Sequence, residues 1–290
     1  MFDRYVLVDW SANSTPKRGR DSIWIALLDG HRTTVENHST RAGAERRLGD
    51  IVDDGSDRRT LIGVDFSLGY PTGTGVAFGV DGEPWCSTMS MITEMIVDDE
   101  HNANNRFEVA AALNERMTGV AAPFWGCPPA RTSPTLGSTK PASFGPVDEW
   151  RVVEQRLRGD GSQPFSSWQL LGAGAVGSQT LLGVPMVHRL LRREQGLVHV
   201  WPFTTGLRAP VADDPTVVIV EVWPSMLFPI GSTSSSGAVV RDEAQVRAAV
   251  AWLASVDADG SVAEFFAPDV TTAERVAIER EEGWVLGVAG

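Results

Sequence analysis

Carboxylates interrupt several of the most apolar stretches of this chain. Asp9 follows the run YVLV, Asp65 follows LIGV, and Glu221 lies inside VVIVEVWP. Burying an unpaired carboxylate is costly, so an acid in such a place is usually paired with a base or bound to a cation. Two or three carboxylates that reach one point form an all-oxygen site suited to Mg²⁺ or Mn²⁺. The first chemistry that the residues indicate is therefore that of a divalent metal.

The elements around these acids decide whether they can meet. Strands are predicted for YVLVDWSA, SIWIALLDG and HRTTVENHS, which would form a hairpin-linked meander. A helix is predicted for RAGAERRLGDIVDDG, followed by a fourth strand in RTLIGVDFSLGYP. If the first and fourth strands are parallel neighbours, Asp9 and Asp65 project from adjacent carboxyl ends. Ligands bind at that edge in open α/β sheets.

The rest of the chain predicts an insertion and a return to α/β order. Residues 67 to about 165 are rich in Gly, Pro, Ser and Trp, with helices expected at 104–118 and 146–159 and a long covering loop between them. A helix that starts at Pro185, two strands in LVHVWPF and TVVIVEVWPSMLF, a helix in RDEAQVRAAVAWLASV and a surface helix in TTAERVAIEREEG follow. We predict one α/β domain over residues 1–290, with a large, mostly helical and loop insertion after the fourth strand.

This arrangement resembles the ribonuclease H-like fold, a mixed sheet flanked by helices with acids on strands one and four. The segments VLVDWSA, GVDFSLGYP, VGSQTLLGVP, VHVWPF and VIVEVWPS, spread from about residue 5 to 225, are similar to motifs of a bacterial family of unknown function. That family is described as predicted nucleases with this fold. Its acidic start to a late helix is matched loosely by RDEAQV, at Asp242 and Glu243.

The resemblance implies a metal-dependent phosphodiesterase or nuclease. Asp9 would bridge two metal ions, with Asp65 and Glu221 as further ligands and catalytic residues and Asp242 as an additional metal ligand. Lys17, Arg18 or Arg131 would offset charge that develops on the phosphate. Structural roles stay open for each acid. Asp9 and Asp65 would then cap helices or close turns, Glu221 would pair with an arginine, and Asp242 would interact with a helix dipole.

Composition and motifs exclude several other classes. A net charge of −12 disfavours tight binding of long nucleic acid, so a small phosphorylated molecule or a short nucleic acid is the expected partner. The glycines of LLGAGAVGSQTLLGVP have GxGxxG spacing, but the helix expected after them would be broken by Gly183 and Pro185, which argues against NAD. No paired Cys or His motif indicates zinc, and no apolar run is long enough to span a membrane. We expect a cytoplasmic protein, with homo-oligomerisation left open.

Two other function classes fit the same sequence. An enzyme or binder of nucleotides or other small phosphorylated ligands, of the actin-like ATPase type, would also use a first-strand aspartate to organise metal and phosphates. A protein that keeps the fold without catalysis would bind no metal, and neutralising Asp9 or Asp65 would then change only its stability.

Overall fold

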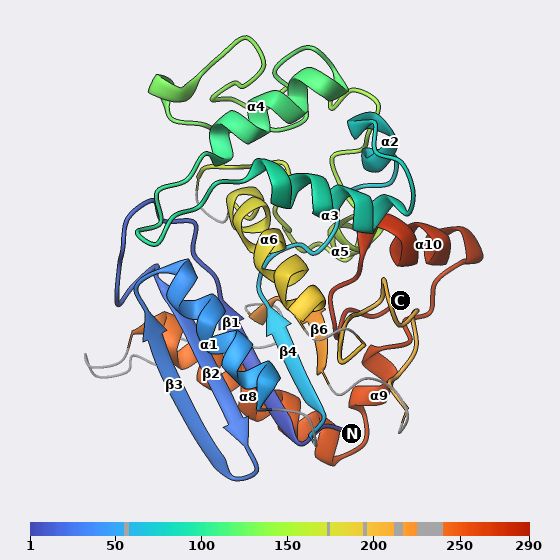
Figure 1. Cartoon of the computed structure of the whole chain (residues 1–290). Helices are drawn as coiled ribbons and strands as arrows, with labels where there is room; N and C mark the ends of the chain where they lie inside the picture. The colour runs from blue at the N-terminus through green and yellow to red at the C-terminus, as the bar shows by residue number, and fades with distance from the viewer. Residues whose placement is uncertain (55–57, 173–174, 194–195, 212–216, 225–239) are drawn as a thin grey trace.

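A six-stranded mixed sheet forms the centre of the protein (Figure 1). The computed structural model describes residues 1–54, 58–172, 175–193, 196–211, 217–224 and 240–290. The strands lie in the order β3-β2-β1-β4-β6-β5. The first three form an antiparallel meander, and β4, β6 and β5 run parallel to β1. Their bounds are β1 Arg4–Asp9, β2 Ile23–Asp29, β3 Arg32–His38, β4 Thr60–Val64, β5 Val198–Val200 and β6 Val217–Glu221.

Helices cover both faces of this sheet, which explains why its central strands are apolar throughout. On one face, Val8, Val64 and Ile219 pack in a core beneath α1 (Arg41–Asp53) and α6 (Gly177–Arg193). On the other, Leu7 and Val220 pack in a second core with α8 (Arg241–Ala258), which contacts β1 and β2. Figure 1 shows α1 in front of the sheet and α8 behind it. The predicted α/β class with flanking helices is confirmed.

Between β4 and α6 the chain forms helices and loops, as expected for the insertion at 67–165. Figure 1 shows α3 and α4 stacked beyond one end of the sheet. The remaining helical elements are α2 Thr74–Phe78, α3 Pro84–Met95, α4 Arg106–Met117, η1 Pro129–Arg131, α5 Val152–Gly159, α9 Val262–Phe265, α10 Thr272–Ala277 and the π-helical turn η2 Ile278–Glu282. The helices α2, α3 and α9 were not predicted.

The expected helix start at Pro185 is wrong, because α6 begins at Gly177 and carries Pro185 in its interior. Gly183 does not break α6 either. A Cβ there would lie 2.3 Å from the ring of Phe66, so this glycine permits close packing of helix against strand end. One further boundary differs from the prediction: α5 begins at Val152 instead of residue 146, and at this start the Glu154 carboxylate accepts from the Arg151 backbone N–H at 2.7 Å. The surface helix predicted in TTAERVAIEREEG is present as α10, which buries no residue, and η2 continues it with Ile278 buried.

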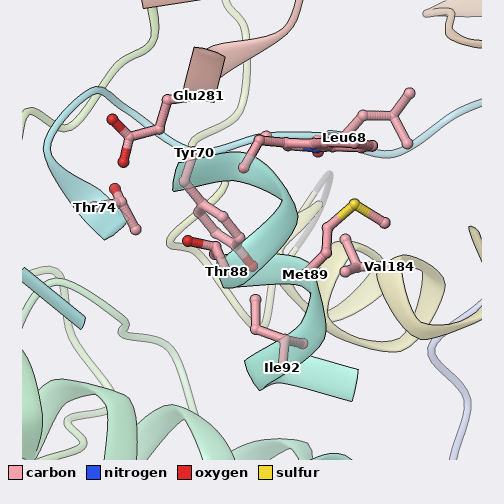
Figure 2. Close-up of a pocket in the computed structure, with 10 residues that line it drawn as sticks. Leu68, Tyr70, Thr74, Thr88, Met89, Ile92, Val184 and Glu281 are labelled. Atoms are coloured by element: carbon pink, nitrogen blue, oxygen red, sulfur yellow. The ribbon is translucent and has the colours of Figure 1, made fainter. Parts of the chain in front are cut away.

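A small cavity lies where α3 packs against α6 (Figure 2). Thr88, Met89 and Ile92 of α3 line it together with Val184 of α6 and the ring of Tyr70. Its volume is about 10 Å³, which is close to that of a single water molecule. This cavity belongs to the packing of the insertion, and it is too small to hold a substrate.

Candidate functional site

Asp9 and Asp65 lie side by side at the carboxyl ends of two neighbouring strands. The parallel register pairs Val8 with Val64, so the next residue of each chain segment is an aspartate on the same face of the sheet. The two carboxyl groups are within hydrogen-bonding distance of each other. The backbone N–H of Trp10 donates to Oδ1 of Asp65 at 2.8 Å, which fixes one carboxyl group of the pair.

Burial and mutual repulsion make this pair hold a proton. Burial raises the pKa of Asp9 well above its ordinary value, and the charges of Asp65 and Asp242 raise it further. Burial also raises the pKa of Asp65 to about 7, although the Trp10 N–H partly opposes this. A hydrogen bond between two carboxyl groups requires one proton between them. Near neutral pH the pair is therefore poised between a shared proton and two negative charges.

Asp242, which is far from Asp9 and Asp65 in the sequence, faces the same cleft as Asp9. It lies in the first turn of α8, where the helix dipole favours a carboxylate. Its Oδ2 accepts a hydrogen bond from the backbone N–H of Asp21 at 2.7 Å, and its charge acts on both Asp9 and Asp65. The structure thus brings together three of the four acids that the sequence singled out.

These acids border two open clefts. The first has a volume of about 560 Å³ and is bordered by Asp9, Asp21 and Asp242. Its wall includes the β1–β2 loop, Arg106, the glycine-rich turn at Gly172 and the start of α6 at Ser178 and Gln179. The second cleft, of about 500 Å³, is bordered by Asp65, and Gln179 borders both. The carboxyl pair is therefore reachable by a small ligand.

Glu221 does not join this site, and its expected role as a catalytic residue and metal ligand is corrected. It pairs in register with Val64, so its side chain points to the face opposite that of Asp65. It is fully buried and accepts two hydrogen bonds from the guanidinium of Arg151, at 2.6 and 2.8 Å. The backbone N–H of Leu68 donates a third, at 3.0 Å. Glu221 is thus paired with an arginine, which was the alternative left open, and it shares that arginine with Glu154.

The predicted phosphate-facing cations are placed differently from expectation. Lys17 pairs with Asp21 at 3.3 Å, beside the first cleft without lining it. Arg18 donates to the carbonyl oxygen of Asn37 at 2.6 Å, and Arg131 pairs with Glu108 on the surface. Neither Arg18 nor Arg131 lines either cleft. The arginine that does is Arg106, which no sequence pattern had indicated.

The donor set at Asp9 and Asp65 fits a hard divalent cation. No lysine or arginine among the described residues forms a salt bridge with either carboxylate, so their charge is left without a partner when the shared proton is lost. No three His, Cys, Asp or Glu side chains in that part of the chain stand close enough to enclose a metal as they are oriented. Two adjoining carboxylates are therefore preformed, and Asp242 becomes a third ligand only if its side chain moves closer to them.

The GxGxxG segment leads into α6, which runs unbroken through Gly183 and Pro185, so the helix break used as an argument against NAD is not found. The residues before Gly172 form a turn and isolated bridges instead of a strand. Gly174 lies outside the described residues.

Comparisons with protein-family models, with curated proteins and with solved structures found no match to this chain. No helix in the described residues is long and apolar enough to cross a membrane.

Proposed function

We propose that this protein has a ribonuclease H-like fold and is a divalent-metal-dependent hydrolase of phosphoesters. The fold proposal is supported by the strand arrangement: an antiparallel meander, a helix, and a fourth strand that pairs in parallel with the first. The observation that carries the functional proposal is the contact between Asp9 and Asp65 at adjacent strand ends, open to two clefts.

Some residues of the site bind the cation, and others orient the carboxylates or the substrate. Asp9 and Asp65 hold the cation, and the Trp10 N–H keeps the Asp65 carboxylate oriented toward its partner. Asp242 approaches from α8 and completes the negative site. A bound Mg²⁺ or Mn²⁺ supplies an activated water and stabilises charge on phosphoryl oxygens. Gln179, which borders both clefts, is placed to orient a substrate beside the acids.

The substrate that fits best is small. A net charge of −12 repels a long polyanion, and the cleft beside Asp9 has the volume of a nucleotide-sized ligand. Short nucleic acids or small phosphodiesters are therefore the proposed substrates, in preference to a long duplex.

The proposal is tested by titrating Mn²⁺ into the metal-free protein by calorimetry at pH 8, for the wild type, Asp9→Asn and Asp81→Asn. Asp81 is an exposed aspartate of the insertion and serves as the control. We expect binding by the wild type and the control, and a loss of at least tenfold in Asp9→Asn. Hydrolysis of a generic phosphodiester and of a short single-stranded oligonucleotide should follow the same order. Equal Mn²⁺ binding by Asp9→Asn and the wild type contradicts the proposal.

A second candidate is an enzyme or binder of small phosphorylated ligands, of the actin-like ATPase type. Gly172 in the wall of the first cleft favours it, because a glycine lets a phosphate approach the backbone closely. Thermal stabilisation by a mononucleotide with Mg²⁺, together with no cleavage of oligonucleotides or phosphodiesters, would select this function over the first. A protein that binds neither metal nor nucleotide would be the non-catalytic alternative.

A further inference from the structure

A buried arginine without a carboxylate partner forms part of the wall of the first cleft. Arg106, the first residue of α4, is 8% exposed and borders the same cleft as Asp9 and Asp242. Its Nε donates to the hydroxyl of Ser178 at 2.9 Å, and its Nη1 donates to the hydroxyl of Ser14 at 3.0 Å and to Oδ1 of Asn104 at 2.8 Å. All three acceptors are neutral, so the guanidinium has hydrogen-bond partners but no counter-ion.

The two carboxylates whose charges act on Arg106, Asp98 and Glu108, are already committed to other arginines. Asp98 accepts two hydrogen bonds from Arg41, at 2.5 and 2.6 Å, and Glu108 pairs with Arg131. The Nη2 group of Arg106 makes no hydrogen bond to a described residue. A guanidinium is rarely this buried without an anion, because its planar fork of donors matches carboxylate or phosphate.

The amino end of a long helix points to the same place. The 17-residue helix α6 begins at Gly177, and Ser178 in its first turn is the residue that accepts from Arg106. A Cβ on Gly177 would lie 2.5 Å from the carbonyl oxygen of Ser167, so glycine lets this helix start approach the preceding turn closely. The helix dipole and the guanidinium thus place positive potential on one wall of the cleft. The acids occupy another part of its lining.

We propose that Arg106, Ser14 and the amino end of α6 form a subsite for a phosphate group of the substrate, with Ser178 holding the Arg106 guanidinium in place. The inference deepens the proposed function and rests on it for the identity of the cleft as a substrate site. A cation held at Asp9 and a guanidinium at Arg106 both favour an anionic substrate, as a phosphoester is. The cleft therefore selects phosphoesters over neutral esters, and Arg106 is the substrate-binding residue that Lys17, Arg18 and Arg131 were expected to supply.

The test uses inorganic phosphate as the probe, in the presence of EDTA and at constant ionic strength. We expect phosphate to bind the wild type in calorimetry, Arg106→Gln to weaken binding at least tenfold, and Arg131→Gln, the matched control, to bind as the wild type does. Asp9→Asn should bind phosphate equally or more tightly, because it removes a negative charge from the cleft. Since no metal is present, this result is independent of whether the Mn²⁺ titration succeeds.

Equal phosphate affinity in the wild type and Arg106→Gln overturns the subsite, as does the absence of phosphate binding by the wild type. Arg106 would then only brace the loop at Ser14. If Arg106→Gln does not fold, the wild type itself decides the question by arginine modification with phenylglyoxal and peptide mapping. Phosphate should slow modification at Arg106 and leave Arg131 unaffected, and equal rates at Arg106 with and without phosphate contradict the inference.

Discussion

The Asp9–Asp65 pair is the residue-scale feature with the clearest energetic consequence. Because the pKa of both acids is raised, the folded protein binds a proton more tightly than the unfolded chain does. The stability contributed by this proton is present below the unfolded pKa of about 4 and is lost as the pH rises through the folded value of about 7. At alkaline pH the metal-free site is therefore a destabilising feature of the fold.

Asp65→Asn should stabilise the metal-free protein at pH 8. The substitution removes the repulsion, and the amide oxygen can still accept from the Trp10 N–H. We expect a gain on the order of 1–3 kcal/mol in the free energy of unfolding at pH 8, and a smaller gain at pH 5. Urea denaturation at both pH values measures it, with Asp81→Asn as the control. A variant less stable than the wild type at pH 8 would show that the pair is not strained.

The same proton competes with a cation for the carboxylates. Mn²⁺ affinity of the wild type should rise by roughly fivefold between pH 6 and pH 7 and by about twofold more up to pH 8, because one proton with a pKa of about 7 must leave before the metal binds. Calorimetric titrations across this range, corrected for buffer ionisation, test the prediction. An affinity that is flat from pH 6 to pH 8 would place the metal away from this pair.

Local sequence patterns predicted Asp9 and Asp65 of this site but not Arg106. Asp9 and Asp65 each directly follow an apolar strand, so their place at the sheet edge could be derived from local sequence. Arg106 could not, because its partners Ser14 and Ser178 lie 92 and 72 residues away in the chain and no local pattern connects them.

At the scale of elements, strand parity separates Glu221 from the other acids. Glu221, the last residue of β6, pairs with Val64, whereas the site residue Asp65 lies one position after Val64 in the chain. A shift of one residue changes the face of the sheet. Sequence alone did not give the register of β6 against β4, and so it placed Glu221 in the wrong site.

Glu221→Gln should separate stability from metal binding. The substitution weakens the hydrogen bonds from Arg151, whose charge Glu154 still neutralises, so we expect a loss of about 1–2 kcal/mol in the free energy of unfolding. Mn²⁺ affinity should stay within a factor of two or so of the wild type at a temperature where the variant is folded. A large loss of Mn²⁺ affinity without loss of stability would return Glu221 to the site.

Gly183 links the packing of α6 to the carboxyl pair. Gly183→Ala would place a Cβ 2.3 Å from Phe66, the neighbour of Asp65, and overpacking of this kind typically costs about 1–3 kcal/mol. Gly159→Ala in α5 meets open space and should be neutral or slightly stabilising. Thermal unfolding of the wild type and both variants measures the difference. A Gly183→Ala variant as stable as Gly159→Ala would show that α6 can move away from Phe66 at little cost.

At the scale of the whole molecule, the α/β class, the meander and the parallel pairing of the first and fourth strands followed from hydrophobic pattern. The helices α2 and α3 did not, because their stability comes from packing against distant parts of the chain such as Val184 in α6. The insertion is more than a cover for the sheet, since its helix α4 contributes Arg106 to the cleft. The site is thus assembled from β1, β4, α8, α6 and the insertion.

The most direct measurement is a crystal structure of the protein grown with Mn²⁺ at pH 8, with anomalous diffraction recorded for manganese. The account predicts an anomalous peak bonded to carboxylate oxygens of both Asp9 and Asp65, at a distance of about 2.1 Å. It also predicts that Glu221 keeps its contact with Arg151. A manganese peak elsewhere, or none at the two strand ends despite binding in solution, would contradict the assignment of this site.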